Sequence, residues 1–327
     1  MVTFLITGGL GYIGSHICLE LINKNYDIII VDNLINSKIE KLEKIKKYNK
    51  NNSLIEFYNF DLANYELLEN ILKNKKIDVI IHLAGLKAVA ESIKLPLTYY
   101  ENNLISTLNI IKFMENYNIK NIIFSSSATV YGNNNAPFLE TSITGVGITN
   151  PYGRSKFLQE EILKDISISH KDWNIIILRY FNPIGHLNND FCEEPNGIPN
   201  NLFPYLIKVY NGELPILNIF GSDYETRDGT CSRDFINVMD LAIAHIECAN
   251  IALKTNMGLK IYNVGTGNDV TVLELIKSFE KINNFKLNYK FVERREGDIK
   301  TSYSNVDLIN KEIGWKSKYT LDQSVKL

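Results

Sequence analysis

A tyrosine and a lysine stand four residues apart in the stretch TNPYGRSKFLQEE, residues 149–161, where a long helix is predicted to begin. Residues four apart share a helix face, so the phenol of Tyr152 and the ammonium of Lys156 can meet. The pKa of a tyrosine is ordinarily about 10, and a nearby cation lowers it toward values at which the phenolate accepts a proton. The spacing is common by chance, so other residues must decide whether the pair does chemistry.

A serine at the end of a predicted strand supplies a third group. The segment NIIFSSS (121–127) changes from apolar to polar, which places Ser127 at the carboxyl end of a strand. Together with Tyr152 and Lys156 it could handle protons, with the serine holding a substrate hydroxyl. A nucleophilic serine is the weaker interpretation, because the chain has no G-x-S-x-G motif and none of its five histidines has a triad context.

Glycines follow the first predicted strand in the stretch ITGGLGYIGSH, residues 6–16. They form the pattern G-x-G-x-x-G at Gly9, Gly11 and Gly14, with Gly8 in front. Between a strand and a helix this pattern is typical of a dinucleotide-binding loop, because the backbone can approach a pyrophosphate at the N-terminus of the helix.

The ends of the following strands supply further polar residues. The segment DIIIV (27–31) leads to Asp32, whose carboxylate can accept a hydrogen bond from a ribose 2′-hydroxyl and repel a 2′-phosphate. No arginine follows immediately, so we predict NAD rather than NADP as the cofactor. The stretches FDLAN and HLAGLKAV place Asp61 and Lys87 at comparable strand ends.

The elements that must position these residues alternate regularly over the first half of the chain. Strands are predicted at 2–7, 27–31, 77–84, 121–127 and 174–181, and helices at 12–24, 38–48, 64–74, 98–116 and 152–166. Apolar strands alternating with helices indicate a parallel sheet covered on both faces, so the predicted fold is α/β with a Rossmann-type doubly wound sheet.

The regular alternation of predicted strands and helices ends after residue 181, where prolines, asparagines and glycines interrupt the spacing. We predict a smaller, mixed α/β substrate-binding lobe, made mainly of residues 182–327. Residues 1–181 form the predicted NAD-binding domain, and roughly 234–266 rejoin its sheet through a helix and a further strand.

Composition excludes several classes of protein. The 327 residues carry a net charge of −2, so the basic field expected of a nucleic-acid or anionic-membrane binder is absent. The four cysteines are scattered without a C-x-x-C motif, and no metal-binding motif is visible. The apolar run at the N-terminus is too short for a signal peptide or a membrane span, so we expect a cytoplasmic protein.

With these residues in view, the chain resembles the extended short-chain dehydrogenases/reductases, and among them the UDP-galactose (UDP-glucose) 4-epimerases, over essentially its whole length. The motifs that carry the resemblance are TGGLGYIGSH, HLAGLKAVAES, FSSSATVYG, PYGRSK, LRYFNPIG, GIPNNL, DGTCSRDFINVMD and RREGD. The resemblance implies reversible conversion of UDP-galactose into UDP-glucose through a 4-keto sugar, with NAD regenerated in each cycle. It implies that Tyr152 is the base and acid, that Lys156 tunes it, and that Ser127 orients the sugar hydroxyl.

The resemblance also implies two sets of binding residues. The cofactor set is Gly8, Gly11, Tyr12, Ile13, Gly14, Asp32, Asn33, Asp61, Leu62, Leu83, Ala84, Gly85, Lys87, Asn102, Tyr152, Lys156 and Phe181. The UDP-sugar set is Lys87, Ser127, Tyr152, Asn182, Asn201, Leu202, Phe220, Arg233, Arg295, Asp298 and Ser302. The two arginines suit a pyrophosphate, which rewards bidentate charged donors. By the same resemblance we expect a homodimer formed through the helices at 98–116 and 152–166.

One of the departures from the family pattern bears on the substrate. Ser302 stands where strict hexose epimerases tend to carry a bulky tyrosine beside the sugar 2-substituent, and a small residue there resembles epimerases that also accept N-acetylated sugars. The hypothesis is therefore that UDP-GlcNAc and UDP-GalNAc are also substrates. The register rests on RREGD, and the neighbouring Tyr303 could occupy the same space.

Four competing functions remain. A nucleotide-sugar 4,6-dehydratase would need the Asp-Glu pair that relatives carry where this chain has Ala128-Thr129. A UDP-uronate 4-epimerase or a decarboxylase shares more of the site. A non-catalytic NAD-sensing regulator would often have lost Tyr152 or Lys156, and both are present.

Overall fold

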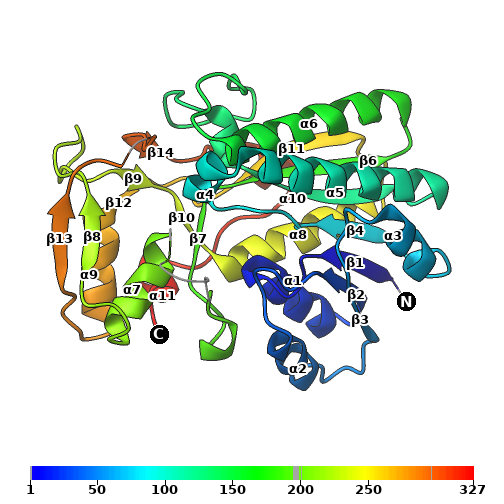
Figure 1. Cartoon of the computed structure of the whole chain (residues 1–327), viewed down its shortest axis with the longest axis horizontal. Helices are drawn as coiled ribbons and strands as arrows, with labels where there is room; N and C mark the ends of the chain where they lie inside the picture. The colour runs from blue at the N-terminus through cyan, green and yellow to red at the C-terminus, as the bar shows by residue number, and fades with distance from the viewer. Residues whose placement is uncertain (1, 194–198, 200, 296) are drawn as a thin grey trace.

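A parallel sheet of seven strands forms the centre of the molecule (Figure 1). The structure is a computed structural model that describes residues 2–193, 199, 201–295 and 297–327. The strand order is β11-β6-β5-β4-β1-β2-β3, and every neighbouring pair is parallel. The strands are β1 (Thr3–Thr7), β2 (Asp27–Asp32), β3 (Ile55–Asn59), β4 (Val79–His82), β5 (Asn121–Ser127), β6 (Asn174–Tyr180) and β11 (Leu259–Val264).

The order of the strands reverses between β1 and β4. The chain enters at β1, adds β2 and β3 on one side, and then crosses to β4 on the other side. In an open parallel sheet, ligands bind beyond the carboxyl ends of the strands at such a reversal. The topology therefore predicts a ligand site at the loops that follow β1, β2, β4 and β5.

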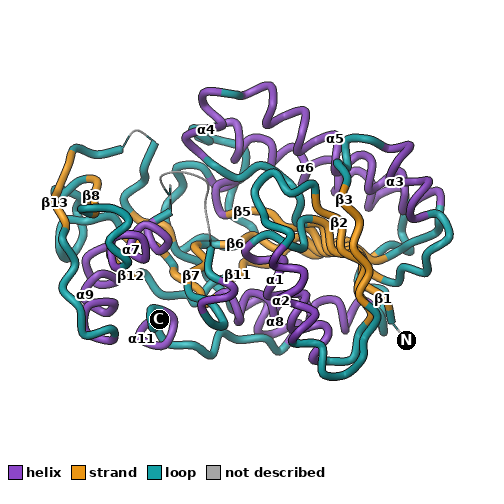
Figure 2. Tube along the Cα trace, turned by 60° about the horizontal axis from the view of Figure 1, so that its bottom comes forward, coloured by secondary structure: helices purple, strands orange, loops and turns teal. Residues whose placement is uncertain are grey.

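Helices cover both faces of this sheet, with α1, α2 and α8 on one face and α3, α5 and α6 on the other (Figure 2). Strands such as β1, β4 and β6 are buried along their whole length, as expected when both faces are covered. Among the described residues no helix is both long enough and apolar enough to cross a bilayer. The helices around the sheet are α1 (Tyr12–Asn23), α2 (Glu40–Lys47), α3 (Tyr65–Leu72), α4 (Val89–Lys94), α5 (Pro96–Asn116), α6 (Pro151–Ser169), α8 (Val238–Ala252) and α10 (Asp307–Ile313).

A smaller lobe stands beside the carboxyl ends of the sheet and has its own apolar core. Side chains of α7, α9 and α11 form that core together with β8, and Phe203, Leu206, Leu275 and Phe279 are fully or almost fully buried. The elements are β7 (Asn182–Ile184), α7 (Leu202–Tyr210), β8 (Leu217–Phe220), β9 (Ser232–Arg233), β10 (Phe235–Asn237), β12 (Val270–Thr271), α9 (Val272–Ile282), β13 (Tyr289–Val292), β14 (Thr301–Ser302) and α11 (Leu321–Ser324). They pair as β10-β7, β12-β9-β14 and β13-β8.

The α/β fold with a Rossmann-type sheet is confirmed, and β11 rejoins that sheet beside β6 as expected. One strand of the sheet, β3, was not among the predicted strands; it lies at the edge and none of its residues is fully buried. We propose a domain division in which residues 1–181, joined by about 234–266, bind the cofactor. The packing of α8 against α1 and the sheet supports this division.

Candidate active site

A cavity of about 810 Å³ lies between the carboxyl ends of the central strands and the smaller lobe. Both predicted binding sets and the catalytic group contribute to its walls. The predicted residues that line it are Gly8, Gly11, Tyr12, Ile13, Gly14, Asp32, Asn33, Asp61, Leu62, Leu83, Ala84, Gly85, Lys87, Asn102, Ser127, Tyr152, Lys156, Phe181, Asn182, Asn201, Arg233, Arg295, Asp298 and Ser302. Segments more than 200 residues apart in the sequence thus meet around one space.

The glycine loop brings backbone donors to this cavity. Gly8 has a positive φ of 70° and donates its N–H to Val31 O at 2.7 Å, which turns the chain sharply at the end of β1. A Cβ at Gly14 would collide with Gly8 O, so only glycine allows α1 to start this close to the loop. Gly11 caps α1 with no side-chain partner for the first N–H groups. The loop therefore offers an open helix N-terminus, which suits a pyrophosphate.

Asp32 is held in place at the end of β2. Its carboxylate accepts hydrogen bonds from Leu10 N at 3.0 Å, Leu34 N at 2.9 Å and Ser37 Oγ at 2.7 Å. The side chain is buried and lines the cavity next to Asn33. A carboxylate fixed in this way can accept from a ribose hydroxyl and excludes a phosphate there.

Tyr152 lies in the first turn of α6, and the two residues before it fix where that helix begins. Asn150 caps it by accepting a hydrogen bond from Gly153 N at 2.8 Å, and Pro151 at the first position has no N–H to lose. Burial raises the pKa of Tyr152, while a hydrogen bond with Ser127 and the charge of Lys87 oppose that shift. Ser127 ends β5 and also accepts from Thr129 Oγ1 at 3.0 Å.

Lys156 lies one turn further along α6 and is buried. Its Nζ donates to Ser125 O at 2.7 Å and lies 4.9 Å from the centre of the Phe124 ring. Burial lowers the pKa of Lys156 to about 7, against the opposing charge of Glu160. Glu160 is itself held by Arg179, at 3.0 and 2.7 Å. An ammonium in this pocket is therefore stabilised further by any anion that enters the cavity.

A second cation, Lys87, reaches the cavity from the loop after β4. Its Nζ donates to Glu193 Oε1 at 2.5 Å, and Asn201 Nδ2 lies 3.5 Å from the same oxygen. Partial desolvation lowers the pKa of Lys87, whose side chain is 53% exposed, but the Glu193 carboxylate outweighs this effect and the pKa is raised. Lys87 therefore stays charged, and it is the lysine whose charge lowers the pKa of Tyr152.

The lobe contributes two arginines that share one carboxylate. Asp298 accepts from Arg295 Nε at 3.1 Å and Nη2 at 2.9 Å, and its Oδ1 lies 3.5 Å from Arg233 Nη2. Arg233 also donates to Ile299 O at 2.9 Å. Two guanidinium groups at one end of the cavity can hold both phosphates of a nucleotide diphosphate.

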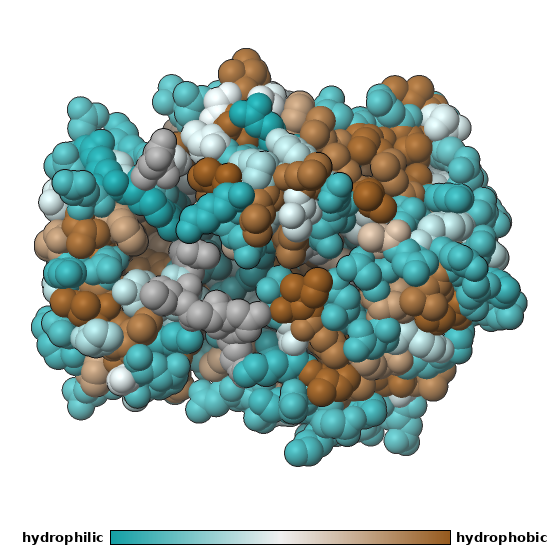
Figure 3. All heavy atoms as spheres, viewed as in Figure 1, coloured by the Kyte–Doolittle hydropathy of each residue, from teal (hydrophilic) through white to brown (hydrophobic). Residues whose placement is uncertain are grey.

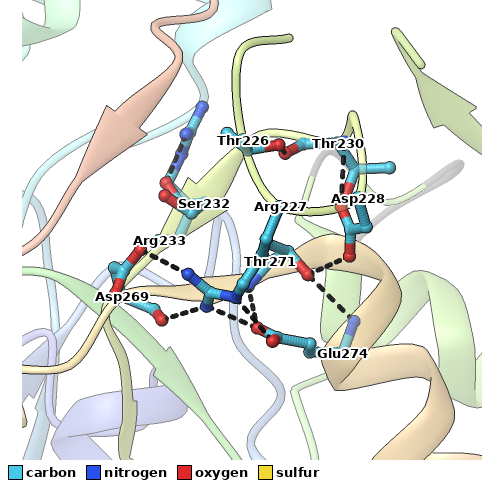
Figure 4. Close-up of polar contacts among 9 residues, drawn as sticks. All are labelled: Thr226, Arg227, Asp228, Thr230, Ser232, Arg233, Asp269, Thr271 and Glu274. Carbon is cyan, nitrogen blue, oxygen red and sulfur yellow. Dashed lines mark hydrogen bonds and ion pairs between the residues drawn. The ribbon is translucent and has the colours of Figure 1, made fainter. Parts of the chain in front are cut away.

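A network of polar contacts fixes the loop that leads into Arg233 (Figure 4). The Arg227 guanidinium binds both carboxylate oxygens of Glu274 at 2.6 Å and Asp269 Oδ2 at 2.8 Å. Asp228 accepts from Thr230 Oγ1 at 2.7 Å and from Thr271, the residue that caps α9. These contacts therefore hold the loop just before β9 against α9, and β9 is the strand that carries Arg233.

Comparison with known proteins decides the family. A family model described as GDP-mannose 4,6 dehydratase matches residues 5–327. The chain is 47% identical over 324 residues to a UDP-glucose 4-epimerase of Pasteurella multocida, covering 98% of this chain and 95% of that protein. The corresponding protein of Bacillus subtilis is 44% identical over 321 residues, covering 98% and 93%. The chain belongs to the UDP-glucose 4-epimerase family.

Solved structures agree with this family membership. The UDP-glucose 4-epimerase of Bifidobacterium longum, solved with NAD+ and UDP, superposes with a TM-score of 0.94 at 44% identity, covering 99% of this chain and 96% of that one. The epimerase of Stenotrophomonas maltophila, solved with NAD and a formylated UDP-arabinopyranose, also gives 0.94 at 37% identity, with 99% and 96% covered. The cavity of this chain thus lies in a fold that binds both kinds of ligand in those proteins.

Two predicted substrate residues do not line the cavity. Leu202 begins α7 and packs against the apolar core of the lobe, and Phe220 is 37% exposed with its ring 5.6 Å from the Arg295 guanidinium. Ser302 lines the cavity, whereas Tyr303 is not among the described residues that do so. The motifs GIPNNL (197–202) and RREGD (294–298) lie partly outside the described residues.

Sequence reasoning missed several residues of the cavity wall. Ser37, five residues beyond Asp32, binds that carboxylate and could have been found from its place in the loop after β2. Thr129 and Glu193 touch Ser127 and Lys87, but Glu193 stands in an irregular segment with no periodicity to place it. The other missed residues that matter to the wall are Ser125, Asn150, Tyr180, Pro204 and Ile299.

Proposed function

We propose that the protein interconverts UDP-galactose and UDP-glucose by NAD-dependent inversion at carbon 4 of the hexose. The observation that carries this proposal is a single cavity that joins a dinucleotide-binding loop, the Ser127–Tyr152 pair and the two arginines of the lobe. The full-length similarity to UDP-glucose 4-epimerases supports it.

The residues present fit NAD. The open N-terminus of α1 would hold the pyrophosphate. A Cβ at Gly8 would lie 3.0 Å from Ala84 N, so glycine lets the loops after β1 and β4 lie close together beneath the cofactor. Asp32 would hold the adenosine ribose, and Lys156 the nicotinamide ribose. NAD, when bound, supplies the group that takes up a hydride from carbon 4 and returns it to the opposite face of the sugar.

Tyr152 handles the proton in this proposal. Its oxygen takes the proton of the 4-hydroxyl as carbon 4 is oxidised, and returns it when the 4-keto sugar is reduced. Ser127 holds the sugar oxygen beside the phenol. The ammonium group of Lys87 opposes the burial that raises the pKa of Tyr152. The role proposed for Lys156 is to add to this stabilisation of the phenolate when its own side chain is protonated. The Arg233 and Arg295 side chains hold the pyrophosphate while the sugar turns.

A dehydratase mechanism lacks its groups here, although the matching family model takes its description from a dehydratase. Elimination needs a carboxylate pair after the serine, and this chain has Ala128-Thr129. Thr129 instead donates from its N–H and its hydroxyl to Ser127. This contact supports a role for Ser127 in orienting the sugar hydroxyl rather than in elimination.

Incubating the purified protein with UDP-galactose, without added NAD, tests the proposed function. We expect UDP-glucose to appear in the proton NMR spectrum, because a resident cofactor is regenerated in every cycle. A 4-keto-6-deoxy sugar would identify a dehydratase instead. An absence of turnover in protein that contains NAD would contradict an enzymatic function.

We further propose that the enzyme accepts UDP-GlcNAc and UDP-GalNAc. Ser302 is small, buried and on the cavity wall, which leaves space for an N-acetyl group. One solved relative, 32% identical with a TM-score of 0.85, is described as a UDP-Glc/GlcNAc 4-epimerase from Campylobacter jejuni. Ser302→Tyr should abolish turnover of the N-acetylated pair and spare UDP-galactose.

Thr301→Tyr is the control for this substitution, because successive side chains of a strand point to opposite faces. It should leave both activities close to those of the wild type. No wild-type activity on UDP-GalNAc, or full activity in Ser302→Tyr, would contradict the substrate proposal.

We also propose a homodimer formed through α5 and α6. These adjacent helices expose Leu97, Ile105 and Leu108 on α5 and Leu158 on α6, by 38 to 67%. Figure 3 shows hydrophobic side chains gathered over this part of the molecule. Light scattering should give a dimer for the wild type and a monomer for Leu108→Lys. Phe291→Lys, at an exposed position of the lobe, should remain a dimer, and a monomeric wild type would contradict the proposal.

A further inference from the structure

Six buried polar residues beneath the cavity form one connected set of hydrogen bonds. They are Thr7 on β1, His82 on β4, Asn103 and Thr107 on α5, and Ser155 and Gln159 on α6, and we call them the buried frame. Each is at most 1% exposed. Because they are buried, most of their donors and acceptors are expected to find partners within the protein, and each exception needs an explanation.

The first part of the buried frame determines where the proton of His82 lies. Thr7 Oγ1 accepts from Ala84 N at 3.2 Å and from Leu83 N at 3.1 Å, an N–H that it shares with Thr7 O, so two donors face its lone pairs. Its own hydrogen therefore points to His82 Nδ1, 2.8 Å away. The imidazole must then carry its proton on Nε2, and it donates to Thr107 Oγ1 at 3.0 Å.

The second part is consistent with that assignment. Thr107 Oγ1 donates to Asn103 O at 3.1 Å, so it is free to accept from His82 and from Gln159 Nε2, which lies 2.6 Å away. Gln159 Nε2 also donates to Asn103 O at 2.7 Å, and this carbonyl fixes the amide orientation because it can only accept. Burial, together with the charge of Lys156, lowers the pKa of His82 to about 3, so the ring is neutral.

Both ends of the buried frame reach the active site. Asn103 binds the backbone of Leu86 twice, accepting from its N–H at 2.8 Å and donating to its carbonyl at 3.1 Å. It also donates to Ser155 Oγ at 2.9 Å, and Ser155 donates to Tyr152 O at 2.7 Å. Leu83, Ala84 and Leu86 all line the cavity. The loop on which the cofactor would rest is thus connected by side chains to the turn that carries Tyr152.

Gln159 takes part in this arrangement although one of its own atoms destabilises the fold. Its Oε1 is buried and has no hydrogen-bond partner among the described residues. A buried acceptor without a partner destabilises a fold, and a methionine of similar size would avoid the loss. The reason for an amide at this position is therefore the pair of hydrogen bonds that its two N–H groups donate to Thr107 and Asn103.

We propose that His82 and Gln159 are positioning residues for the epimerase reaction, and that the buried frame they close keeps Tyr152 in register with the cofactor-binding loop. The inference rests on the proposed function for its kinetic consequence. Its structural content, the proton position on His82 and the connection to Tyr152, stands apart from the identity of the sugar.

The first test compares two substitutions of Thr107 in the NAD-loaded enzyme. Thr107→Val keeps the shape of the side chain and removes the hydroxyl, whereas Thr107→Ser keeps the hydroxyl. We expect kcat for UDP-galactose to fall about tenfold or more in the valine variant, since small misplacements of reacting groups are costly, and to stay within about twofold in the serine variant. KM and NAD content should change little in both, because binding contacts are untouched.

Gln159→Met separates positioning from stability. It removes the two donors together with the unpartnered acceptor, so the melting temperature should be preserved while kcat falls by about the same factor as in Thr107→Val. Leu163→Met, one turn further along the same buried face of α6, is the matched control and should keep wild-type kcat. Should Thr107→Val fail to fold, Gln159→Met carries the kinetic test.

The readout that does not depend on activity is the nitrogen-15 NMR spectrum of His82. We expect the neutral ring protonated at Nε2, with and without NAD. A ring protonated at Nδ1, an imidazolium near neutral pH, or unchanged kcat in Gln159→Met would overturn the inference. If the wild type does not convert UDP-galactose, the proposed function fails, while the NMR measurement still tests the buried frame.

Discussion

The two ends of the cavity are built in different ways. The catalytic end consists of Ser127, Tyr152 and Lys156 on β5 and α6, where Lys156 is 4% exposed. The nucleotide end consists of Arg233, Arg295 and Asp298, which lie on or beside the two-residue strands β9 and β14, and the Arg295 side chain is 45% exposed. One end is part of the core of the sheet, and the other lies on loops of the smaller lobe.

This difference suggests that the catalytic end carries out the chemistry and that the nucleotide end recognises the substrate. Buried polar groups are mostly hydrogen-bonded, so Lys156 is held by its contact with Ser125, while Asn150 fixes the start of the helix that carries Tyr152. The arginines are paired with Asp298, within the same part of the lobe, and this pairing can be exchanged for a pyrophosphate when substrate enters. Changes at the catalytic end should therefore act on kcat, and changes at the nucleotide end on KM.

The largest effect is expected for Tyr152→Phe, which removes the proton acceptor and keeps the ring. Loss of a general acid and base costs about 10²- to 10⁴-fold in kcat. KM for UDP-galactose and the amount of NAD in the purified protein should be close to wild type. Steady-state kinetics and cofactor extraction check this, and a loss of less than about tenfold would assign the proton to another group.

Lys156→Met should change how stability depends on pH in cofactor-free protein. The pKa of Lys156 is about 7 in the folded state and about 10.5 ordinarily. Below pH 7 the folded and unfolded states are both protonated, so the wild type bears the full cost of the buried charge, which declines as the pH rises from 7 to 10.5. The variant should thus be more stable at low pH, by up to about 5 kcal/mol, with the gap closing above pH 7. Urea unfolding at several pH values measures this, and a gap that widens with pH would contradict it.

Arg295→Lys should weaken binding of the sugar nucleotide and leave chemistry intact. A lysine cannot make the bidentate contact to a phosphate, so KM should rise about tenfold with kcat nearly unchanged. Arg294→Lys is the control, because Arg294 pairs with Asp223 at the surface. An equal rise in KM for both variants would show that net charge, rather than a contact in the cavity, is responsible.

The smallest effect is expected for Arg227→Met, which breaks the contacts with Glu274 and Asp269. These side chains are about 40% exposed, so the loss should be below about 1 kcal/mol. The hydrogen bond with Arg227 lowers the pKa of Glu274 to about 2, so its contribution is present above pH 4.5 and is lost as the pH falls toward 2. The difference in urea unfolding between wild type and variant should accordingly shrink between pH 7 and pH 3.

The same contrast explains what the sequence could predict. Regular spacing and strand ends were sufficient to predict that the glycine loop, Asp32, Ser127, Tyr152 and Lys156 lie at one cavity, because each stands near the end of a buried strand or the start of a helix. The edge strand β3 was missed because its residues alternate between polar and apolar and none is fully buried. Leu202, Phe220 and Glu193 belong to the irregular lobe, where the position of a side chain depends on contacts between distant segments.

In the proposed reaction the hydrogen of carbon 4 stays within the cavity, while only the hydroxyl proton passes through Tyr152. The direct measurement uses UDP-galactose with deuterium at carbon 4, incubated in ordinary water with the purified protein. We expect UDP-glucose that retains the deuterium at carbon 4, as seen by NMR and mass spectrometry. Loss of the label to water during conversion would contradict it.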